Sequence, residues 1–189
     1  PITAGGGIRS VEDAGILLTS GADKIAINSA CIEKPELISE IAERFGTQCV
    51  VVSIQARKDP ILNSWTCMYE NAKEKSNIAM DDWIKRVQEL GAGEILLTSV
   101  DQDGTCKGPD IELIDKACKV CKIPLIVGGG ISKIEHIERC IQNDVVTGIS
   151  LASALHKKKL DIINIKKELK KKYISIRSNS LSNFTNMPD

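Results

Sequence analysis

The chain has 189 residues, 42% of them hydrophobic, and its 25 basic and 25 acidic side chains leave a formal net charge of zero. This size and apolar content suit one domain with a buried core, whereas balanced charge creates no overall field that would attract nucleic acid. No apolar run approaches the roughly 20 residues of a membrane-spanning helix, so we expect neither a nucleic-acid partner nor a membrane partner.

The seven cysteines are scattered through apolar segments, and the first residues do not resemble a secretory signal. We therefore expect free thiols in a cytoplasmic protein. Cys118 and Cys121 form a CxxC pair, but no second pair or nearby histidine completes a metal-binding set. Helical spacing places both near one buried face. We predict no metal and no cofactor.

Short β-branched segments alternate along the chain with longer segments whose apolar residues recur about every 3.6 positions, the pattern of βα units on a parallel sheet. Pro35 at a helix start and Gly46 or Gly91 after a helix end support this pattern. The expected strands are 1–4, 23–27, 49–54, 94–98, 124–127 and 147–151. The expected helices are 10–19, 34–45, 78–91, 110–120, 133–142 and 160–171.

Two segments fall outside this alternation. The stretch 58–77 is polar, contains Trp65 and is longer than an ordinary βα loop. It is either a lid over a site or a solvated hairpin without a catalytic role. Residues 178–189 are polar and aperiodic, which predicts a frayed C-terminal tail.

An internal repeat relates the two ends of the chain. Pro1-Ile-Thr-Ala-Gly-Gly-Gly-Ile aligns with Pro124-Leu-Ile-Val-Gly-Gly-Gly-Ile, and Ile25-Ala-Ile-Asn-Ser-Ala aligns with Ile149-Ser-Leu-Ala-Ser-Ala. The first two βα units therefore recur as the last two, as in a protein of two four-unit halves. We expect an α/β fold, a (β/α)8 TIM barrel that lacks its first two βα units in this chain, so that residues 1–177 supply the third to eighth units.

Both glycine triplets lie between a strand and a helix, where backbone N–H groups can approach an anion. Each triplet is followed one strand later by a small polar segment, Asn28-Ser29 or Ala152-Ser153. Because phosphate sites of parallel barrels form in the loops after the strands, the duplication predicts two phosphate pockets for a substrate with a phosphate at each end. A tight turn without a ligand is the alternative.

The strand at 94–98 ends in a cluster of hydroxyls and carboxylates. Thr98, Asp101 and Asp103 are spaced so that several can face the barrel mouth. A carboxylate there can relay protons to and from a ring that opens or closes. For Asp103, an Asx turn that caps the next helix is the alternative.

Two charged residues lie at the amino ends of their expected strands, opposite to the ends that would form the barrel mouth. Lys24 opens one expected strand and Glu94 opens another. Inward-facing charges at the barrel floor are costly unless they are paired. We expect an ion pair between them, which acts as a gate if it can open and as a plug if it cannot.

Ordered motifs resemble one known family over residues 1 to about 177. They are GGGIRSVEDA, GADKIAIN, ERFGTQCVVVSI, LGAGEILLTSVDQDGT and LASALH. Together they resemble the cyclase subunit of imidazole glycerol phosphate synthase. The resemblance implies a lyase that forms a heterodimer with a glutaminase subunit docked on the barrel floor.

Ammonia from that partner would cleave and cyclise a bisphosphorylated substrate, phosphoribulosyl-formimino aminoimidazole carboxamide ribonucleotide. The products would be imidazole glycerol phosphate, for histidine biosynthesis, and aminoimidazole carboxamide ribonucleotide. By the same resemblance Lys24 and Glu94 match the ammonia gate, and Asp23 matches the glutaminase interface. The residues that match the phosphate sites are Gly7, Asn28 and Ser29 for one site and Asp103, Gly104, Gly130, Ala152 and Ser153 for the other.

One matching position departs from the family pattern. The family's catalysis uses an aspartate on the first strand and another in an Ile-Asp-Ala context, where this chain has Ile54-Gln55-Ala56. Glutamine cannot accept a proton at neutral pH as a carboxylate does, so Gln55 predicts poor cyclase turnover. The candidate catalytic residues are Gln55, Thr98, Asp101 and Asp103. The alternatives are a paralogous barrel that delivers glutaminase-derived ammonia for sugar amidation in surface-polysaccharide biosynthesis, and a non-catalytic subunit that activates a glutaminase.

Overall fold

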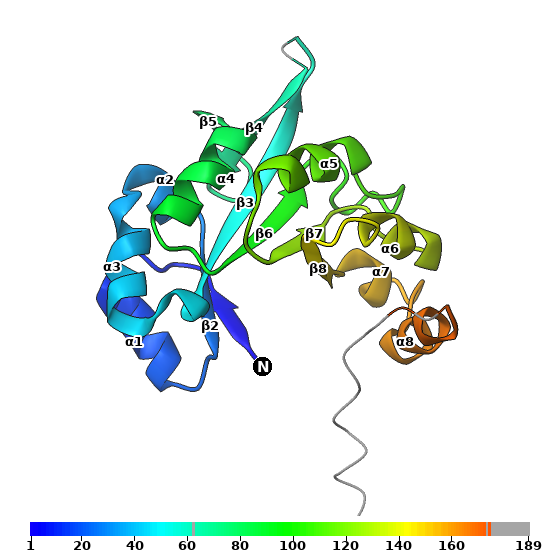
Figure 1. Cartoon of the computed structure of the whole chain (residues 1–189), viewed down its shortest axis with the longest axis horizontal. Helices are drawn as coiled ribbons and strands as arrows, with labels where there is room; N and C mark the ends of the chain where they lie inside the picture. Colours follow the sequence, from blue (N-terminus) through cyan, green and yellow to red (C-terminus); the bar gives the residue numbers. More distant parts are fainter. Residues whose placement is uncertain (62, 173, 175–189) are drawn as a thin grey trace, which may run out of the picture.

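The computed structural model describes residues 1–61, 63–172 and 174. Its curved parallel sheet has the strand order β1-β2-β3-β6-β7-β8 (Figure 1). The parallel strands are β1 (Thr3–Gly5), β2 (Lys24–Ile27), β3 (Val50–Asp59), β6 (Glu94–Ser99), β7 (Leu125–Gly128) and β8 (Val146–Ser150). The helices are α1 (Val11–Thr19), α2 (Ser29–Glu33), α3 (Glu36–Phe45), α4 (Met80–Glu89), α5 (Ile111–Val120), α6 (Ile134–Cys140), α7 (Ser153–His156) and α8 (Ile162–Lys171), with a 3-10 turn at Thr47–Cys49.

Each expected strand and each expected helix is present within a few residues of its predicted bounds. The short helices α2 and α7 were not expected; they begin directly after Asn28 and Ala152, which are equivalent positions of the repeat. The predicted tail at 178–189 lies outside the described residues. Among the described helices, none combines the length and the apolar character that a membrane crossing requires.

Side chains of the parallel strands alternate between the face covered by helices and the concave face. In β6, Ile95 and Leu97 are buried beneath the helices, whereas Glu94 and Thr98 are partly exposed on the concave face. Figure 1 shows α1 and α3 on one flank of the sheet and α5, α6 and α8 on the other. Because Thr98 pairs with Gln55 in register, these two side chains lie together at the carboxyl ends of their strands.

Residues 58–77 continue the sheet as an antiparallel extension. β4 (Ser64–Tyr69) pairs with β3, and β5 (Glu74–Ala79) pairs with β4; Figure 1 shows them projecting past the helices. Trp65 on β4 is only 1% exposed. The segment is therefore a hairpin with one buried tryptophan, and whether it acts as a lid or has no catalytic role stays a prediction.

The parallel sheet is open along its two outer strands. In the described part of the chain, β1 pairs with β2 alone and β8 pairs with β7 alone. The structure thus has an α/β fold with a parallel half-barrel sheet.

Candidate active site

The first cavity lies at the carboxyl ends of β1, β2 and β3 and has a volume of about 700 Å³. The first glycine triplet, the residues after β2 and the turn between β4 and β5 form its walls. Its lining includes Gly7, Asn28, Ser29, Gln55, Glu70 and Asn71. The predicted members of one phosphate site are therefore together in one cavity, and Gln55 lines it as well.

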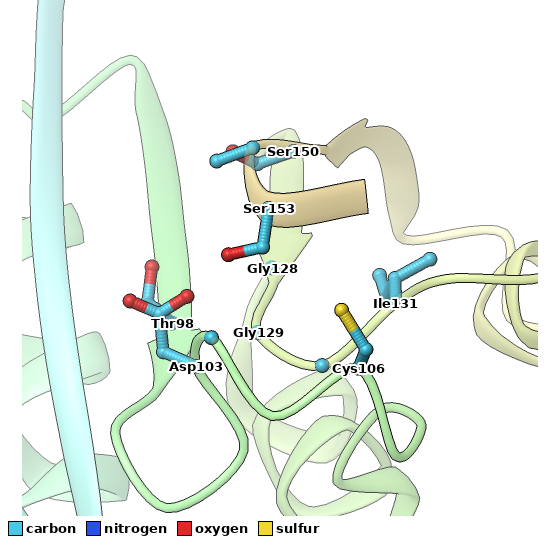
Figure 2. Close-up of a pocket in the computed structure, with 11 residues that line it drawn as sticks. Thr98, Asp103, Cys106, Gly128, Gly129, Ile131, Ser150 and Ser153 are labelled. Atoms are coloured by element: carbon cyan, nitrogen blue, oxygen red, sulfur yellow. The ribbon is translucent and has the colours of Figure 1, made fainter. Parts of the chain in front are cut away.

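The second cavity lies at the carboxyl ends of β6, β7 and β8 and has a volume of about 150 Å³. Figure 2 shows Thr98 and Asp103 on one side of it and Cys106 and Ile131 on the other, with Ser153 between them. The predicted residues found in its lining are Thr98, Asp103, Gly104, Gly130, Ala152 and Ser153. The second predicted set is thus also brought together.

The two glycine triplets repeat in backbone conformation as well as in sequence. Gly6 and Gly129 have φ angles of +101° and +102°, and Gly7 and Gly130 have φ angles of +72° and +76°. Such angles are open to glycine and strained for other residues. The same backbone turn therefore follows β1 and β7.

The surroundings of the two triplets differ. A Cβ atom added to Gly7 would meet nothing within 4 Å, whereas one added to Gly130 would collide with the carbonyl oxygen of Gly108. The second triplet is covered by the loop at 100–110, and the first is open to its cavity. This difference agrees with the smaller volume of the second cavity.

Gln55 is held by its neighbour in the first cavity. The Nδ2 atom of Asn28 donates to Oε1 of Gln55 at 3.1 Å and approaches the carbonyl oxygen of Met68 at 3.4 Å. The backbone N–H of Glu70 donates to the Ser29 hydroxyl at 3.0 Å. The end of β4 therefore contacts Asn28, and the turn after β4 contacts Ser29.

The two aspartates after β6 have different surroundings. Asp103 lines the second cavity, whereas Asp101 lines neither cavity and accepts a hydrogen bond from the backbone N–H of Lys58 at 2.8 Å. The cap of α5 is Asp110, whose Oδ1 accepts from the backbone N–H of Leu113 at 3.1 Å. The alternative in which Asp103 caps the next helix is therefore wrong, and a catalytic role for Asp101 stays a prediction.

At the opposite end of the strands, Lys24 and Glu94 form the expected ion pair. The Nζ atom of Lys24 lies 2.8 Å from Oε2 of Glu94, whose side chain is only 13% exposed. Asp23, next to this pair in sequence, accepts a hydrogen bond from the backbone N–H of Ile2 at 2.6 Å. Whether the pair opens as a gate stays a prediction, as does an interface role for Asp23.

Several lining residues were not predicted from sequence. They are Arg9, Glu70 and Asn71 in the first cavity and Cys106 and Ser150 in the second. The repeat could have indicated Ser150, because it is the counterpart of Ala26 and pairs in register with Gly128. No comparable sequence signal indicates Glu70 and Asn71, which depend on how the extension folds back.

All seven cysteines are free thiols. Burial raises the pKa of the Cys31 and Cys67 thiols to about 12 and that of the Cys118 and Cys140 thiols to about 11, which keeps these thiols protonated at neutral pH. Within the described ranges no three His, Cys, Asp or Glu side chains gather as a metal site would require.

The fold and the two cavities define a class of protein: α/β proteins that bind ligands where the strands of a parallel sheet end. The family model described as "Histidine biosynthesis protein" matches residues 1–161. The chain belongs to this family.

The imidazole glycerol phosphate synthase subunit HisF of Streptococcus mutans is 42% identical over 177 residues, which are 94% of this chain and 70% of that protein. The HisF subunit of Lachnoclostridium phytofermentans is 43% identical over 177 residues, 94% of this chain and 69% of that protein. The HisF subunit of Legionella pneumophila is 51% identical over 135 residues, 71% of this chain and 63% of that protein. The resemblance stated from the motifs is thereby confirmed.

Proposed function

We propose that the chain acts as the cyclase subunit of imidazole glycerol phosphate synthase. In this role it uses ammonia to convert phosphoribulosyl-formimino aminoimidazole carboxamide ribonucleotide to imidazole glycerol phosphate and aminoimidazole carboxamide ribonucleotide. The observation that carries the proposal is the pair of cavities with matching backbone turns, because a substrate with a phosphate at each end needs two such sites.

Each cavity would hold one phosphate. In the first, Gly7 and the Asn28-Ser29 pair offer backbone N–H groups and Ser29 offers its hydroxyl, and Gly7 has no Cβ atom to block approach. In the second, Gly130 offers the same turn. The side chains and backbone that complete the second site are Asp103, Gly104, Ala152 and Ser153.

The reacting part of the substrate would lie across the ends of β3 and β6. There Gln55 and Thr98 are register partners, and each lines one of the two cavities. Thr98 can donate or accept a hydrogen bond and Gln55 can donate from its amide. Asp103 is the carboxylate of the second cavity that can exchange a proton with the substrate.

Ammonia would come from a glutaminase subunit bound at the amino ends of the strands. Lys24 and Glu94 lie at that end and form an ion pair on the concave face. Separation of this pair would open a path between the strands, and Asp23 beside it would contact the partner.

We also propose that the sheet is part of a (β/α)8 barrel in which two further βα units pair with β1 and β8, with residues 1–177 forming the third to eighth units. Exposed apolar side chains support this arrangement: Ile2 directly before β1 and Ile16 on α1 lie at one edge, and Ile162 and Ile163 lie on α8 near the other. Two further units would cover them.

The test is turnover of the ribonucleotide with ammonium salt as the nitrogen source, which makes the result independent of any partner. Formation of both products, lost on Asp103→Asn, supports the proposal. Tight binding of the substrate without turnover would instead favour a subunit that activates a glutaminase.

A second function is favoured by Gln55. The Asn28 amide donates a hydrogen bond to the side-chain oxygen of Gln55. The NH2 group of Gln55 therefore remains as a donor at the position where the family has a proton acceptor. This suits ammonia transfer to another acceptor, as in sugar amidation for surface polysaccharides. Ammonia-dependent amidation of a nucleotide sugar, without cyclase turnover, would identify this function.

A further inference from the structure

The antiparallel extension at 58–77 lines the first cavity and contacts the loop that lines the second. On one side, its turn after β4 lines the first cavity, and Glu70 donates its backbone N–H to Ser29 at 3.0 Å. On the other side, the register partners Lys58 and Trp65 contact the loop at 100–110, which lines the second cavity. The extension is therefore the structural connection between the two cavities.

The loop at 100–110 is fastened to the extension near both of its ends. At its start, the backbone N–H of Lys58 donates to Oδ2 of Asp101 at 2.8 Å. At its end, Nε1 of Trp65 donates to Oδ2 of Asp110 at 3.1 Å. Between these two anchors lie the residues that line the second cavity: Asp103, Gly104 and Cys106.

The Trp65 anchor is the better fixed of the two. Its side chain is 1% exposed, and the ammonium groups of Lys58 and Lys116 lie 5.0 and 5.8 Å from its ring centroid, at distances of cation–π contact. The hydrogen bond from the indole N–H to a carboxylate is charge-assisted. The position of Asp110 is thus determined by a side chain that has little freedom to move.

Asp110 uses its two oxygens for two purposes. Oδ1 accepts from Leu113 and caps α5 at 3.1 Å, while Oδ2 accepts from Trp65 and is 3.5 Å from the Ser99 hydroxyl. Replacement by asparagine keeps an oxygen for the helix cap but presents an NH2 group, which cannot accept, to Trp65. The two roles of Asp110 can therefore be separated.

We propose that Trp65 and Asp110 are positioning residues for the second cavity, because they hold the loop at 100–110 where Asp103 and Gly104 can contact the phosphate end of a ligand. Neither residue lines the cavity, so each acts through the loop. The inference rests on the proposed function in that the ligand of this cavity carries a phosphate.

The experiment is a titration of the isotopically labelled chain with inorganic phosphate, followed by nuclear magnetic resonance. Backbone amide signals of Gly104 and Gly130 report the second cavity, and those of Gly7 and Ser29 report the first. The variants are Trp65→Phe and Asp110→Asn. Trp83→Phe is the matched control, because the chain has two tryptophans and Trp83, which is 3% exposed, lies on α4 and not on the extension.

We expect Trp65→Phe and Asp110→Asn each to weaken phosphate binding at the second cavity by about tenfold, as loss of one charge-assisted hydrogen bond does. The double variant should be no weaker than either single variant, because both remove the same bond. Trp83→Phe should leave this affinity unchanged. Equal affinity at Gly104 and Gly130 in all three single variants would overturn the proposal.

A second measurement keeps the two proposals separable. If the unaltered chain binds phosphate in neither cavity, the proposed phosphate sites fail, and hydrogen exchange then decides the positioning role. Amides at 101–108 should exchange at least about tenfold faster in Trp65→Phe and Asp110→Asn than in Trp83→Phe, because the loop opens more often without the hydrogen bond between Trp65 and Asp110. Exchange at the same rate in the three variants would contradict a positioning role.

Discussion

Asn28 donates its side-chain N–H to the side-chain oxygen of Gln55 across 3.1 Å, so the NH2 group of Gln55 is the part left for a ligand. Two neutral amides, one directly after β2 and one on β3, thus stand where the family has an amide and a carboxylate. Neither can take up a proton at neutral pH. Proton transfer in this cavity therefore depends on a residue other than Gln55.

We expect Gln55→Asp to raise the ammonia-dependent rate of cyclisation, in a barrel whose first strand carries the family's other aspartate. General acid–base assistance is typically worth about a hundred- to ten-thousandfold in rate. The rate should fall as acid protonates the new carboxylate. Steady-state kinetics across pH measure both effects, with Gln55→Asn as the control that gains nothing. Ordinary cyclase turnover by the unaltered protein would show that Asp103 or Asp101 performs the proton transfer.

The two glycine triplets should respond differently to alanine. Gly7→Ala places a Cβ atom in open space and costs about 1–2 kcal/mol for its positive φ angle. The variant should therefore still fold, but its affinity for phosphate in the first cavity should be lower. Gly130→Ala drives a Cβ atom into the Gly108 carbonyl and should reduce the free energy of unfolding by clearly more. Urea unfolding and phosphate titration measure the two effects. Equal losses of stability would contradict the difference in packing.

Replacement of one member of the Lys24–Glu94 ion pair should lower the free energy of unfolding more than replacement of both members does. Lys24→Met leaves the 13% exposed Glu94 carboxylate without its partner. Removal of one partner of a buried ion pair costs about 3–5 kcal/mol of stability. Because Lys24 is 34% exposed, the expected cost lies below that range. Lys24→Met with Glu94→Leu should recover most of the loss. Unfolding free energies of the three variants test this, and a double variant less stable than Lys24→Met would contradict it.

His136 should make stability depend on pH. Burial and the nearby Lys133 lower the pKa of His136 from its ordinary value of 6.5, and its Nδ1 accepts from the backbone N–H of Ser132 at 3.2 Å. The unfolded chain therefore binds a proton at higher pH than the folded chain does. The stability that His136 contributes is complete above pH 6.5 and falls as pH decreases below that value.

His136→Asn keeps an acceptor for Ser132 but does not titrate in this range. Urea unfolding at about pH 7.5 and about pH 5.5 should show a smaller loss on acidification for this variant than for the unaltered protein. The same loss in both would assign the pH dependence to other groups.

Much of the fold could be predicted because the signals are local. Runs such as Val50-Val-Val and Ile95-Leu-Leu have the composition of buried strands, and the triplets mark turns that only glycine adopts without strain. The extension could not be predicted in this way. Its polar sequence includes a buried Trp65, whose environment comes from its hairpin partner Lys58 and from Asp110 and Lys116, which are far along the chain.

The same limit applies to individual site residues. Asp101 and Asp103 are two positions apart and chemically identical, and the sequence offers no reason to separate them. Contact with the Lys58 backbone turns Asp101 away from the cavity that Asp103 lines. Glu70 and Asn71, which line the first cavity, adopt positive φ angles of 49° and 57°, and such angles are uncommon for glutamate, although asparagine adopts them more readily.

The matching turns at the two triplets bear on the direction in which a ligand lies. Gly7 and Gly130 differ by only a few degrees, with φ angles of +72° and +76°, so backbone capture alone would accept a bisphosphate either way round. Side chains have to break this symmetry. Asn28 stands beside one triplet and Ala152 at the equivalent place beside the other. We therefore expect the two ends of a bisphosphate to be distinguished by an amide at one triplet and a methyl group at the other, because the backbone turns that would hold the two phosphates are alike.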